Sequence, residues 1–174
     1  MKIITTLVFL TISFLTIGQP KNNFENEIII IETKESLIEQ LKQFENQAIY
    51  LDIWSVYCGP CIKQFEYKDS LNKFLESKGI VSLYLCVSPE YAIETWKNLI
   101  NEHNLKGYHI FVSTRIIRDY KIGFNIEGEE NYMRLGHNFP YFVIISKGSV
   151  KIKKLEYLPS EKEKLIEEIS IFLN

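Results

Sequence analysis

The stretch Leu51–Cys61 reads LDIWSVYCGPC. It is an apolar run of strand length, interrupted by one carboxylate, and it ends in two cysteines separated by Gly59 and Pro60. Two residues between cysteines let the thiols close a small disulfide ring and reopen it, when a helical turn lies beneath them. The stretch therefore predicts a site that passes electrons between a dithiol and a disulfide.

The rest of the composition is that of one ordinary globular domain. The chain has 174 residues, 46% of them hydrophobic and 24% charged. This length gives room for one substantial core but not comfortably for two. The formal net charge of −2 argues against a cationic surface for nucleic acid, so we expect no nucleic-acid partner.

The first eighteen residues differ in kind from the rest of the chain. Lys2 precedes a run, Ile3–Ile17, that contains only apolar residues with Thr and Ser. At 1.5 Å per residue this run is about 22 Å long, which is short against a hydrocarbon core of about 30 Å. We expect a signal peptide over residues 1–18, a flexible lead-in over 19–26, and an exported, periplasmic protein. An uncleaved amino-terminal membrane anchor is the alternative.

Hydrophobic periodicity predicts alternating strands and helices after residue 26. The predicted strands are Glu27–Thr33, Ala48–Trp54, Ile80–Val87, Tyr108–Val112, Tyr141–Ile145 and an antiparallel partner within Ser149–Tyr157. The predicted helices lie around Leu37–Phe44, from Cys58 to Lys78 before Gly79, from Pro89 through Ile100, around Thr114–Lys121, and from Ser160 to the end. We predict one α/β domain over residues 27–174, with a central mixed sheet, helices on both faces, a closing hairpin and a C-terminal helix.

Two helix starts carry specific predictions. Ser88 followed by Pro89 suits an N-cap and a first helical position. Ser160 with Glu163 suits a capping box at the start of the last helix.

The cysteine pair has an asymmetric chemistry in this setting. Cys58 is expected at the start of a helix that follows a strand, where unpaired N–H groups favour a thiolate. Pro60 fits early in that helix, and Gly59 leaves the front of Cys58 open. Cys61, one turn further in, is expected to be more buried and to break the mixed disulfide that Cys58 forms with a substrate.

Asp52 is the candidate acceptor for the proton that Cys61 must lose, directly or through a water molecule. It stands inside an apolar run, where burial raises a carboxyl pKa and poises the group for proton exchange. The alternative is an edge position at which Asp52 faces solvent.

Other uses of the cysteines fit the sequence less well. A structural zinc site needs four ligands, and no second CxxC is present. His103, His109 and His137 are dispersed and are expected at the surface. Peroxiredoxins place a proline where this chain has Leu51. We expect no metal and no cofactor, and we expect Cys86, in the middle of an apolar strand, to be a buried structural thiol.

The Leu51–Cys61 segment resembles the active site of thioredoxins, with the buried acid Asp52, Trp54, and the CGPC motif. The signal peptide, the segment Trp96–Gly107 and the closing hairpin are more similar to the exported TlpA/ResA-like thiol-disulfide oxidoreductases. This resemblance covers residues 27 to 174 and implies a thioredoxin-like fold. It also implies a cis proline at Pro140, whose neighbour Phe139 pairs through its backbone with an extended substrate strand. An ordinary trans proline that opens a strand is the alternative.

Three positions depart from the family pattern. Glu66 stands where many relatives have a helix-bending proline, so any bend there needs another cause. Tyr57 replaces the commoner tryptophan before the first cysteine. Phe139 replaces a threonine that many exported relatives have beside the thiols. The last two changes alter the surface that a substrate meets.

The leading hypothesis is a periplasmic thiol-disulfide oxidoreductase that reduces protein disulfides. Its expected partners are protein disulfide or dithiol substrates and a membrane or periplasmic electron donor. A disulfide oxidant or isomerase is the rival within the same class. A redox-inert docking module, such as a metallochaperone or a haem-maturation scaffold, is the rival from another class.

Overall fold

The computed structural model describes residues 27–31, 43–44, 46–117, 121–123, 132–134, 139–149 and 151–174. The predictions made for residues 1–26 and for His137, and most of the helix predicted around Leu37–Phe44, lie outside this part of the chain. Of that helix only Phe44 and its neighbour are described, and the Phe44 side chain is buried.

A six-stranded mixed sheet forms the centre of the domain, in the order β1-β4-β3-β2-β7-β8. The first four strands in that order are parallel, whereas β7 runs antiparallel to β2 and β8 antiparallel to β7. The strands are β1 (Glu27–Ile31), β2 (Ala48–Trp54), β3 (Ile80–Ser88), β4 (Tyr108–Ser113), β7 (Tyr141–Ile145) and β8 (Ile152–Lys154). This arrangement confirms the predicted mixed sheet and its closing hairpin.

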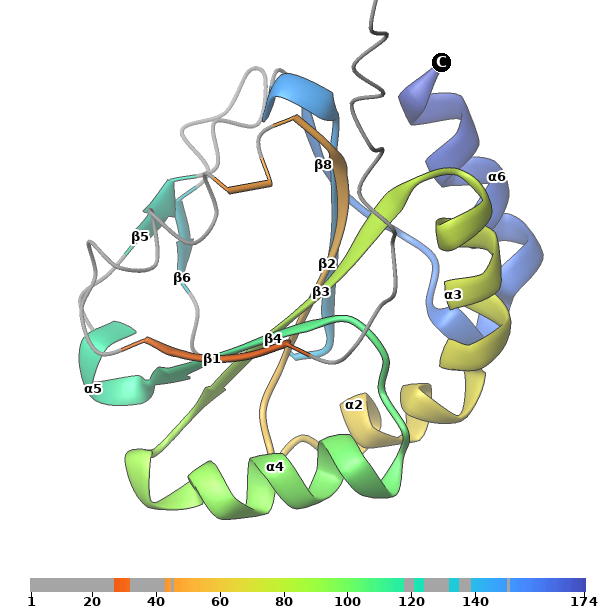
Figure 1. Cartoon of the computed structure of the whole chain (residues 1–174). Coiled ribbons are helices and arrows are strands. Elements are labelled where there is room, and N and C mark those ends of the chain that lie inside the picture. The colour runs from red at the N-terminus through yellow and green to blue at the C-terminus, as the bar shows by residue number, and fades with distance from the viewer. Residues whose placement is uncertain are drawn as a thin grey trace, which may run out of the picture.

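Four of the described helices lie on one side of this sheet. They are α2 (Gly59–Gln64), α3 (Lys68–Ser77), α4 (Ile93–Glu102) and the C-terminal helix α6 (Lys162–Leu173). Figure 1 shows α3, α4 and α6 outside the curved sheet, with a two-stranded ribbon of β5 (Lys121–Gly123) and β6 (Tyr132–Arg134) on the other side. The sequence does not assign the helix predicted around Leu37–Phe44 to either face, and most of it lies outside the described residues.

Strand periodicity divides the core between the two faces, because successive side chains of a strand point to opposite sides. On β2, Ile49, Leu51 and Ile53 belong to the buried cluster of one face. Tyr50, Asp52 and Trp54 alternate with them and face the helices. The acid that precedes the cysteines is therefore enclosed between the sheet and the helix layer.

The helical segment after Cys58 is interrupted once. A 3₁₀ turn, η1 (Phe65–Tyr67), separates α2 from α3. Such turns have tighter hydrogen bonding than an α-helix and often mark a local change in a helix. The interruption includes Glu66, so this chain changes its helix geometry there without a proline. The segment ends at Ser77, close to the predicted end, and Gly79 adopts a positive φ of 65°.

Both capping predictions are wrong in detail. Ser88 is the last residue of β3, and Pro89 is the cap of a 3₁₀ turn, η2 (Glu90–Ala92), that precedes α4. At the last helix the backbone N–H of Leu158 donates to Glu161 Oε2 at 3.4 Å, and η4 (Pro159–Glu161) leads into α6. The N–H of Ser160 instead donates to Gln64 Oε1 at 3.0 Å and ties this turn to α2. In both places the residue predicted as a cap has a tertiary partner instead.

The region between β4 and β7 also differs from its prediction. Of the helix predicted around Thr114–Lys121, the described part is one short turn, α5 (Thr114–Ile117), and Lys121 already belongs to the β5 strand. Residues 118–120 between them lie outside the described part of the chain. The strands predicted from the sequence do not include β5 or β6.

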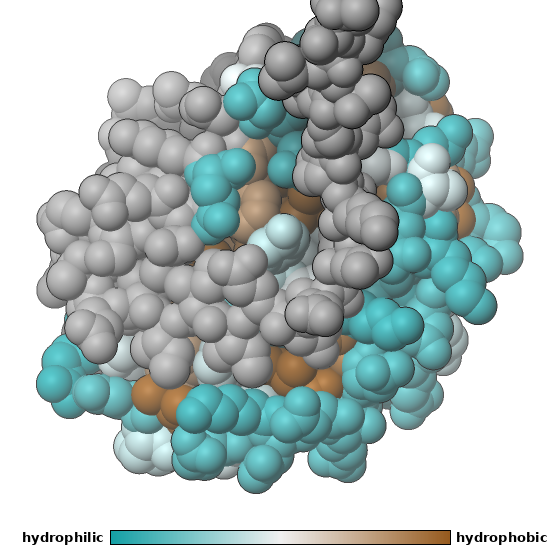
Figure 2. Space-filling model, viewed as in Figure 1, coloured by the Kyte–Doolittle hydropathy of each residue, from teal (hydrophilic) through white to brown (hydrophobic). Residues whose placement is uncertain are grey.

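The surface that Figure 2 shows is mostly hydrophilic along the outer side of α4, at the bottom of the view. This agrees with the amphipathic pattern of the helix, in which Trp96 and Ile100 are buried. Within the described residues, no helix is both long and apolar enough to span a bilayer.

Candidate active site

Cys58 and Cys61 form a disulfide. The sulfurs are 1.97 Å apart and the two Cα atoms 5.2 Å apart. Cys58 is the N-cap of α2, directly after the loop that leaves β2, and the backbone N–H of Cys61 donates to Cys58 Sγ at 3.2 Å. The strand, the loop and the helix start therefore bring the two sulfurs together as the spacing predicts.

The two cysteines differ in exposure. Cys61 is only 1% exposed, whereas Cys58 is partly exposed, and Gly59 and Pro60 beside it are exposed. An added Cβ at Gly59 would meet no heavy atom of the described residues within 4 Å, so none of the side chains that the structure describes covers Gly59. A molecule that approaches from solvent can therefore reach Cys58 and not Cys61.

Ser88 holds the loop that carries Cys58. Its hydroxyl accepts a hydrogen bond from the backbone N–H of Val56 at 3.1 Å and lies 3.0 Å from Ser55 Oγ. Ser88 is fully buried at the end of β3. The residue predicted as a helix cap thus anchors the active-site loop to the neighbouring strand.

Asp52 is buried, which rules out the solvent-facing alternative. Its side chain is 2% exposed. In the sheet register it lies beside Tyr84 of β3 and Phe142 of β7. Burial raises the pKa of Asp52 above its ordinary value, and a nearby cation opposes that rise.

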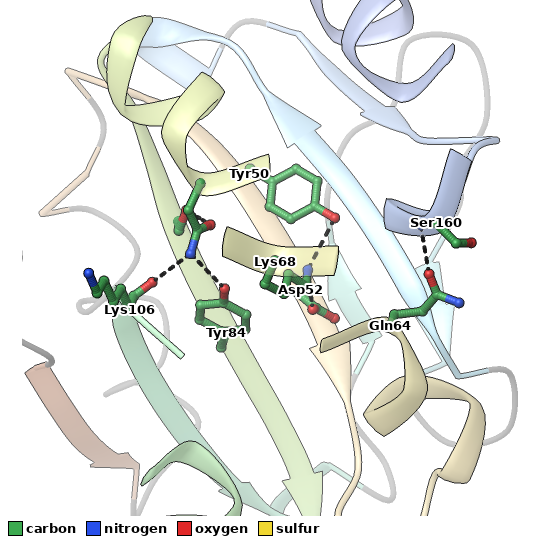
Figure 3. A network of polar contacts seen from close by, with 9 residues as sticks. Tyr50, Asp52, Gln64, Lys68, Tyr84, Lys106 and Ser160 are labelled. Carbon is green, nitrogen blue, oxygen red and sulfur yellow. Dashed lines mark hydrogen bonds and ion pairs between the residues drawn. The ribbon is translucent and has the colours of Figure 1, made fainter. Parts of the chain in front are cut away.

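The cation is Lys68, which the sequence reasoning did not identify. Its Nζ lies 2.7 Å from Asp52 Oδ2, and its side chain is also 2% exposed. It donates to the Tyr50 hydroxyl at 3.4 Å, and Figure 3 shows its nitrogen between that hydroxyl and the Asp52 carboxylate. Burial lowers the pKa of Lys68, and Asp52 opposes that effect. A buried lysine at this place is the main feature of the site that the sequence reasoning missed.

The sequence nevertheless contains a pattern that places Lys68 on the buried side of its helix. The buried side of the helical segment follows helical spacing, through Cys61, Gln64, Phe65, Lys68, Leu71, Asn72 and Leu75. Three of these residues are polar. A lysine on the buried side of an amphipathic helix needs a partner, and a carboxylate in a buried strand supplies one.

The remaining predicted site residues surround the pair. Trp54 is buried at the end of β2, in the same cluster as Cys61, and its ring meets that of Phe65 edge-on at 4.9 Å. Tyr57 is 64% exposed. Phe139 packs against the cluster that contains Cys61, and the peptide bond between Phe139 and Pro140 is cis, as the resemblance implies.

Two further predictions concern residues near the site. Cys86 is a free, buried thiol, as expected, and burial raises its pKa to about 12. His109 is not at the surface, contrary to the prediction. Its ring stacks on that of Tyr84 at 4.8 Å, and its Nε2 donates to the Leu105 carbonyl at 3.1 Å. Burial lowers the pKa of His109 to about 4, so the ring is neutral at neutral pH.

Among the described residues, no group of three or more His, Cys, Asp or Glu side chains has a metal-binding arrangement. The candidate reactive groups of the site are the cysteine pair and the buried Asp52–Lys68 ion pair.

Comparisons with known proteins agree with this geometry. The thiol-disulfide oxidoreductase ResA of a Bacillus cereus strain is 28% identical over 111 residues, which are 63% of this chain and 60% of that protein. The matched part thus spans less than two thirds of the length of this relative.

Solved structures show the thioredoxin-like fold. The thioredoxin domain of a thiol-disulfide oxidoreductase from Bacteroides vulgatus aligns with a TM-score of 0.55 at 17% identity, covering 77% of this chain and 84% of that one. A thiol:disulfide interchange protein from Bacteroides sp. aligns with a TM-score of 0.52 at 19% identity, covering 73% and 78%. The sequence model of the Redoxin family matches residues 30–169, which is most of the chain and includes the whole site, and so this chain belongs to the Redoxin family.

Proposed function

We propose that this protein is a thiol-disulfide oxidoreductase that reduces protein disulfides through a cycle of Cys58 and Cys61. The observation that carries the proposal is the closed disulfide between one partly exposed and one buried sulfur. Only a pair that exchanges with an external molecule needs one accessible sulfur and one protected sulfur. A disulfide across two residues contributes little to stability as a staple, because it closes a very short loop.

The cycle begins with the reduced pair. The Cys58 thiolate attacks a sulfur of the substrate disulfide, so that a mixed disulfide forms and one substrate thiolate leaves. The Cys61 sulfur then attacks Cys58 Sγ, closes the intramolecular disulfide and releases the second substrate thiolate. The substrate gains two electrons, and the protein returns to the oxidised form seen in the structure.

Cys61 must lose its proton before it attacks, and we assign the acceptor role to Asp52. The support is its burial on the helix-facing side of β2, two residues before Trp54, which shares a cluster with Cys61. A carboxylate with a raised pKa is a better proton acceptor at neutral pH than an ordinary one. The accepted proton passes on to solvent after each turnover.

The substrates that suit this site are protein segments rather than small molecules alone. Tyr57 is exposed next to Cys58, and Phe139, with the cis Pro140 after it, packs against the cluster that contains Cys61. An extended chain that pairs with the Phe139 backbone would pass in front of Cys58. The proposed setting is the periplasm, with residues 1–18 as the export signal and a membrane or periplasmic protein as electron donor.

Reduction of insulin disulfides by the protein, with a dithiol as electron donor, tests the activity. We expect turnover in the unmodified protein, none in Cys58→Ser, and a covalent adduct on Cys58 in Cys61→Ser. Lack of turnover in the unmodified protein, with its dithiol form verified by alkylation, would contradict the proposal.

A further inference from the structure

Lys68 is a fully buried cation that the exchange cycle described above does not use. It is the first residue of α3, and its side chain reaches the face of the sheet between β2, β3 and β7. A lone buried ammonium is costly, so a fold that keeps one must supply compensation. Here the side chains around the Lys68 ammonium compensate for its burial.

Three aromatic rings and one carboxylate surround the ammonium. Lys68 Nζ lies 4.8 Å from the centre of the Tyr50 ring, 5.3 Å from that of Tyr84 and 4.9 Å from that of Phe142. Ring faces attract cations at such distances, and more strongly away from water. Together with Asp52 at 2.7 Å, they favour the charged form of Lys68 against the cost of burial.

The Asp52 carboxylate is incompletely satisfied in this arrangement. Lys68 makes an ion pair with Oδ2, but neither carboxylate oxygen accepts a well-aligned hydrogen bond from the described residues. Buried carboxylates ordinarily fill their acceptor sites. Asp52 therefore has acceptor capacity left for one incoming proton.

Few other groups around the pair titrate near neutral pH. From β2 the facing group is Tyr50, and from β3 the facing groups are Tyr84 and, further along, Cys86. Burial raises the pKa values of both tyrosines and of that thiol. β7 contributes only the ring of Phe142, and on α3 the neighbouring Asp69 is exposed. His109, stacked on Tyr84, is neutral.

We propose that Lys68 is a positioning residue which keeps the Asp52 carboxylate ionised, so that Asp52 can take the proton of Cys61 in the second exchange step. This inference rests on the proposed function. The proton moves from the Cys61 sulfur to Asp52 while Lys68 stays protonated, and no further co-reactant is needed. Lys68 does not touch the substrate and acts only through Asp52.

The two exchange steps can be separated with dithiobis(nitrobenzoate), an aromatic disulfide that releases a coloured thiolate. Attack by Cys58 releases one thiolate in a phase whose rate depends on reagent concentration. Attack by Cys61 on the mixed disulfide releases a second thiolate in a phase that is independent of concentration. Cys61→Ser should lose this second phase, which assigns it. Stopped-flow measurement of both phases between pH 5 and pH 9 reports the step that Lys68 is proposed to control.

Lys68→Met should slow the second phase selectively at neutral pH. A cation within 4–6 Å lowers a carboxyl pKa by roughly 1–3 units. Its removal therefore shifts the pH midpoint of the second phase upward by roughly 1–3 units and slows that phase at neutral pH, with recovery at alkaline pH. Lys97→Met removes a partly exposed lysine from its 2.9 Å pair with Glu94 on α4 and should leave both phases unchanged.

Asp52→Asn and the double variant test whether Lys68 acts through Asp52. Asp52→Asn should slow the second phase and remove its pH midpoint. Lys68→Met should then have no additional effect, because the group through which it acts is absent. An unshifted midpoint in Lys68→Met, or an effect that persists in full beside Asp52→Asn, would overturn the inference.

The proposal can be tested even if a variant does not fold. Should Lys68→Met fail to fold, the carboxyl carbon of Asp52 in the unmodified reduced protein, assigned with Asp52→Asn, decides the question by NMR. Ionised Asp52 at pH 7 supports the proposal, and protonated Asp52 contradicts it. Absence of the second phase in the unmodified protein would instead overturn the proposed function itself, and this inference with it.

Discussion

Replacing Lys68 by methionine should destabilise the oxidised protein by about 4 kcal/mol at pH 8. Two unit charges 2.7 Å apart attract by about 6 kcal/mol at an effective dielectric constant of about 20. Breaking a buried pair from one side typically costs about 3–5 kcal/mol, because the remaining charge is uncompensated. Methionine fills most of the same volume, so a cavity adds little.

The stability lost in Lys68→Met should be larger at high pH than at low pH. Burial raises the folded-state pKa of Asp52 above its unfolded value, and loss of Lys68 raises it further. The folded variant then holds its proton more tightly than the unfolded chain, so its stability falls as pH rises through the folded pKa. At about 1.4 kcal/mol per pKa unit, the gap to the unmodified protein should widen by roughly 1.4–4 kcal/mol between pH 5 and pH 8.

Urea unfolding followed by tryptophan fluorescence measures these differences, since Trp54 and Trp96 are both fully buried. The double variant Lys68→Met with Asp52→Asn should regain most of the lost stability, because a neutral pair replaces an unpaired charge. A Lys68→Met protein within about 1 kcal/mol of the unmodified one at both pH values would contradict this prediction, because so small a loss is typical of an exposed ion pair.

Three further substitutions have expected outcomes. Ser88→Ala leaves the buried N–H of Val56 without its acceptor and should lower the free energy of unfolding by about 1–3 kcal/mol in urea titrations, with faster amide exchange at Val56. Tyr57→Ala, at a mostly exposed position, should leave stability within about 0.5 kcal/mol; it should raise KM for insulin but not alter the rate with dithiobis(nitrobenzoate). Gly107→Ala places a Cβ 2.5 Å from the Ser82 carbonyl oxygen at a φ of 138° and should cost about 2–4 kcal/mol by thermal unfolding.

The sequence was sufficient for the parts of this domain that depend on local periodicity. The Ala48–Trp54 strand is found with the predicted bounds, and the strands at Tyr108 and Tyr141 start where predicted. Apolar runs bounded by turn residues identify buried strands well, because both the burial and the bounds are local properties. The cysteine pair follows for the same reason: a strand, a short loop and a helix start determine its geometry.

Features that depend on tertiary partners were not predictable in this way. Ser88 has the local sequence of a helix cap, but its hydroxyl is used by Val56, which follows another strand. Ser160 and Gln64 are 96 residues apart, and their contact replaces the expected capping box. At these two positions a polar group distant in the sequence took the place of the local capping interaction.

The same distinction between local features and tertiary partners applies to the active site. Burial of Asp52 followed from its place in an apolar strand, since no other polar residue there indicates an exposed face. Lys68 belongs to a different element, and only the sheet register brings Tyr84 and Phe142 beside Asp52 to enclose its ammonium. The three polar residues on the buried side of the helical segment were the available sign that such a partner exists.

The most direct test is a redox titration of the unmodified protein against dithiol–disulfide buffers, with alkylation and mass spectrometry at each potential. We expect Cys58 and Cys61 to convert together as one two-electron couple, within the span of about −270 to −120 mV covered by such oxidoreductases, while Cys86 stays reduced throughout. Conversion of either cysteine without the other, or a pair that stays oxidised across the whole span, would contradict this expectation.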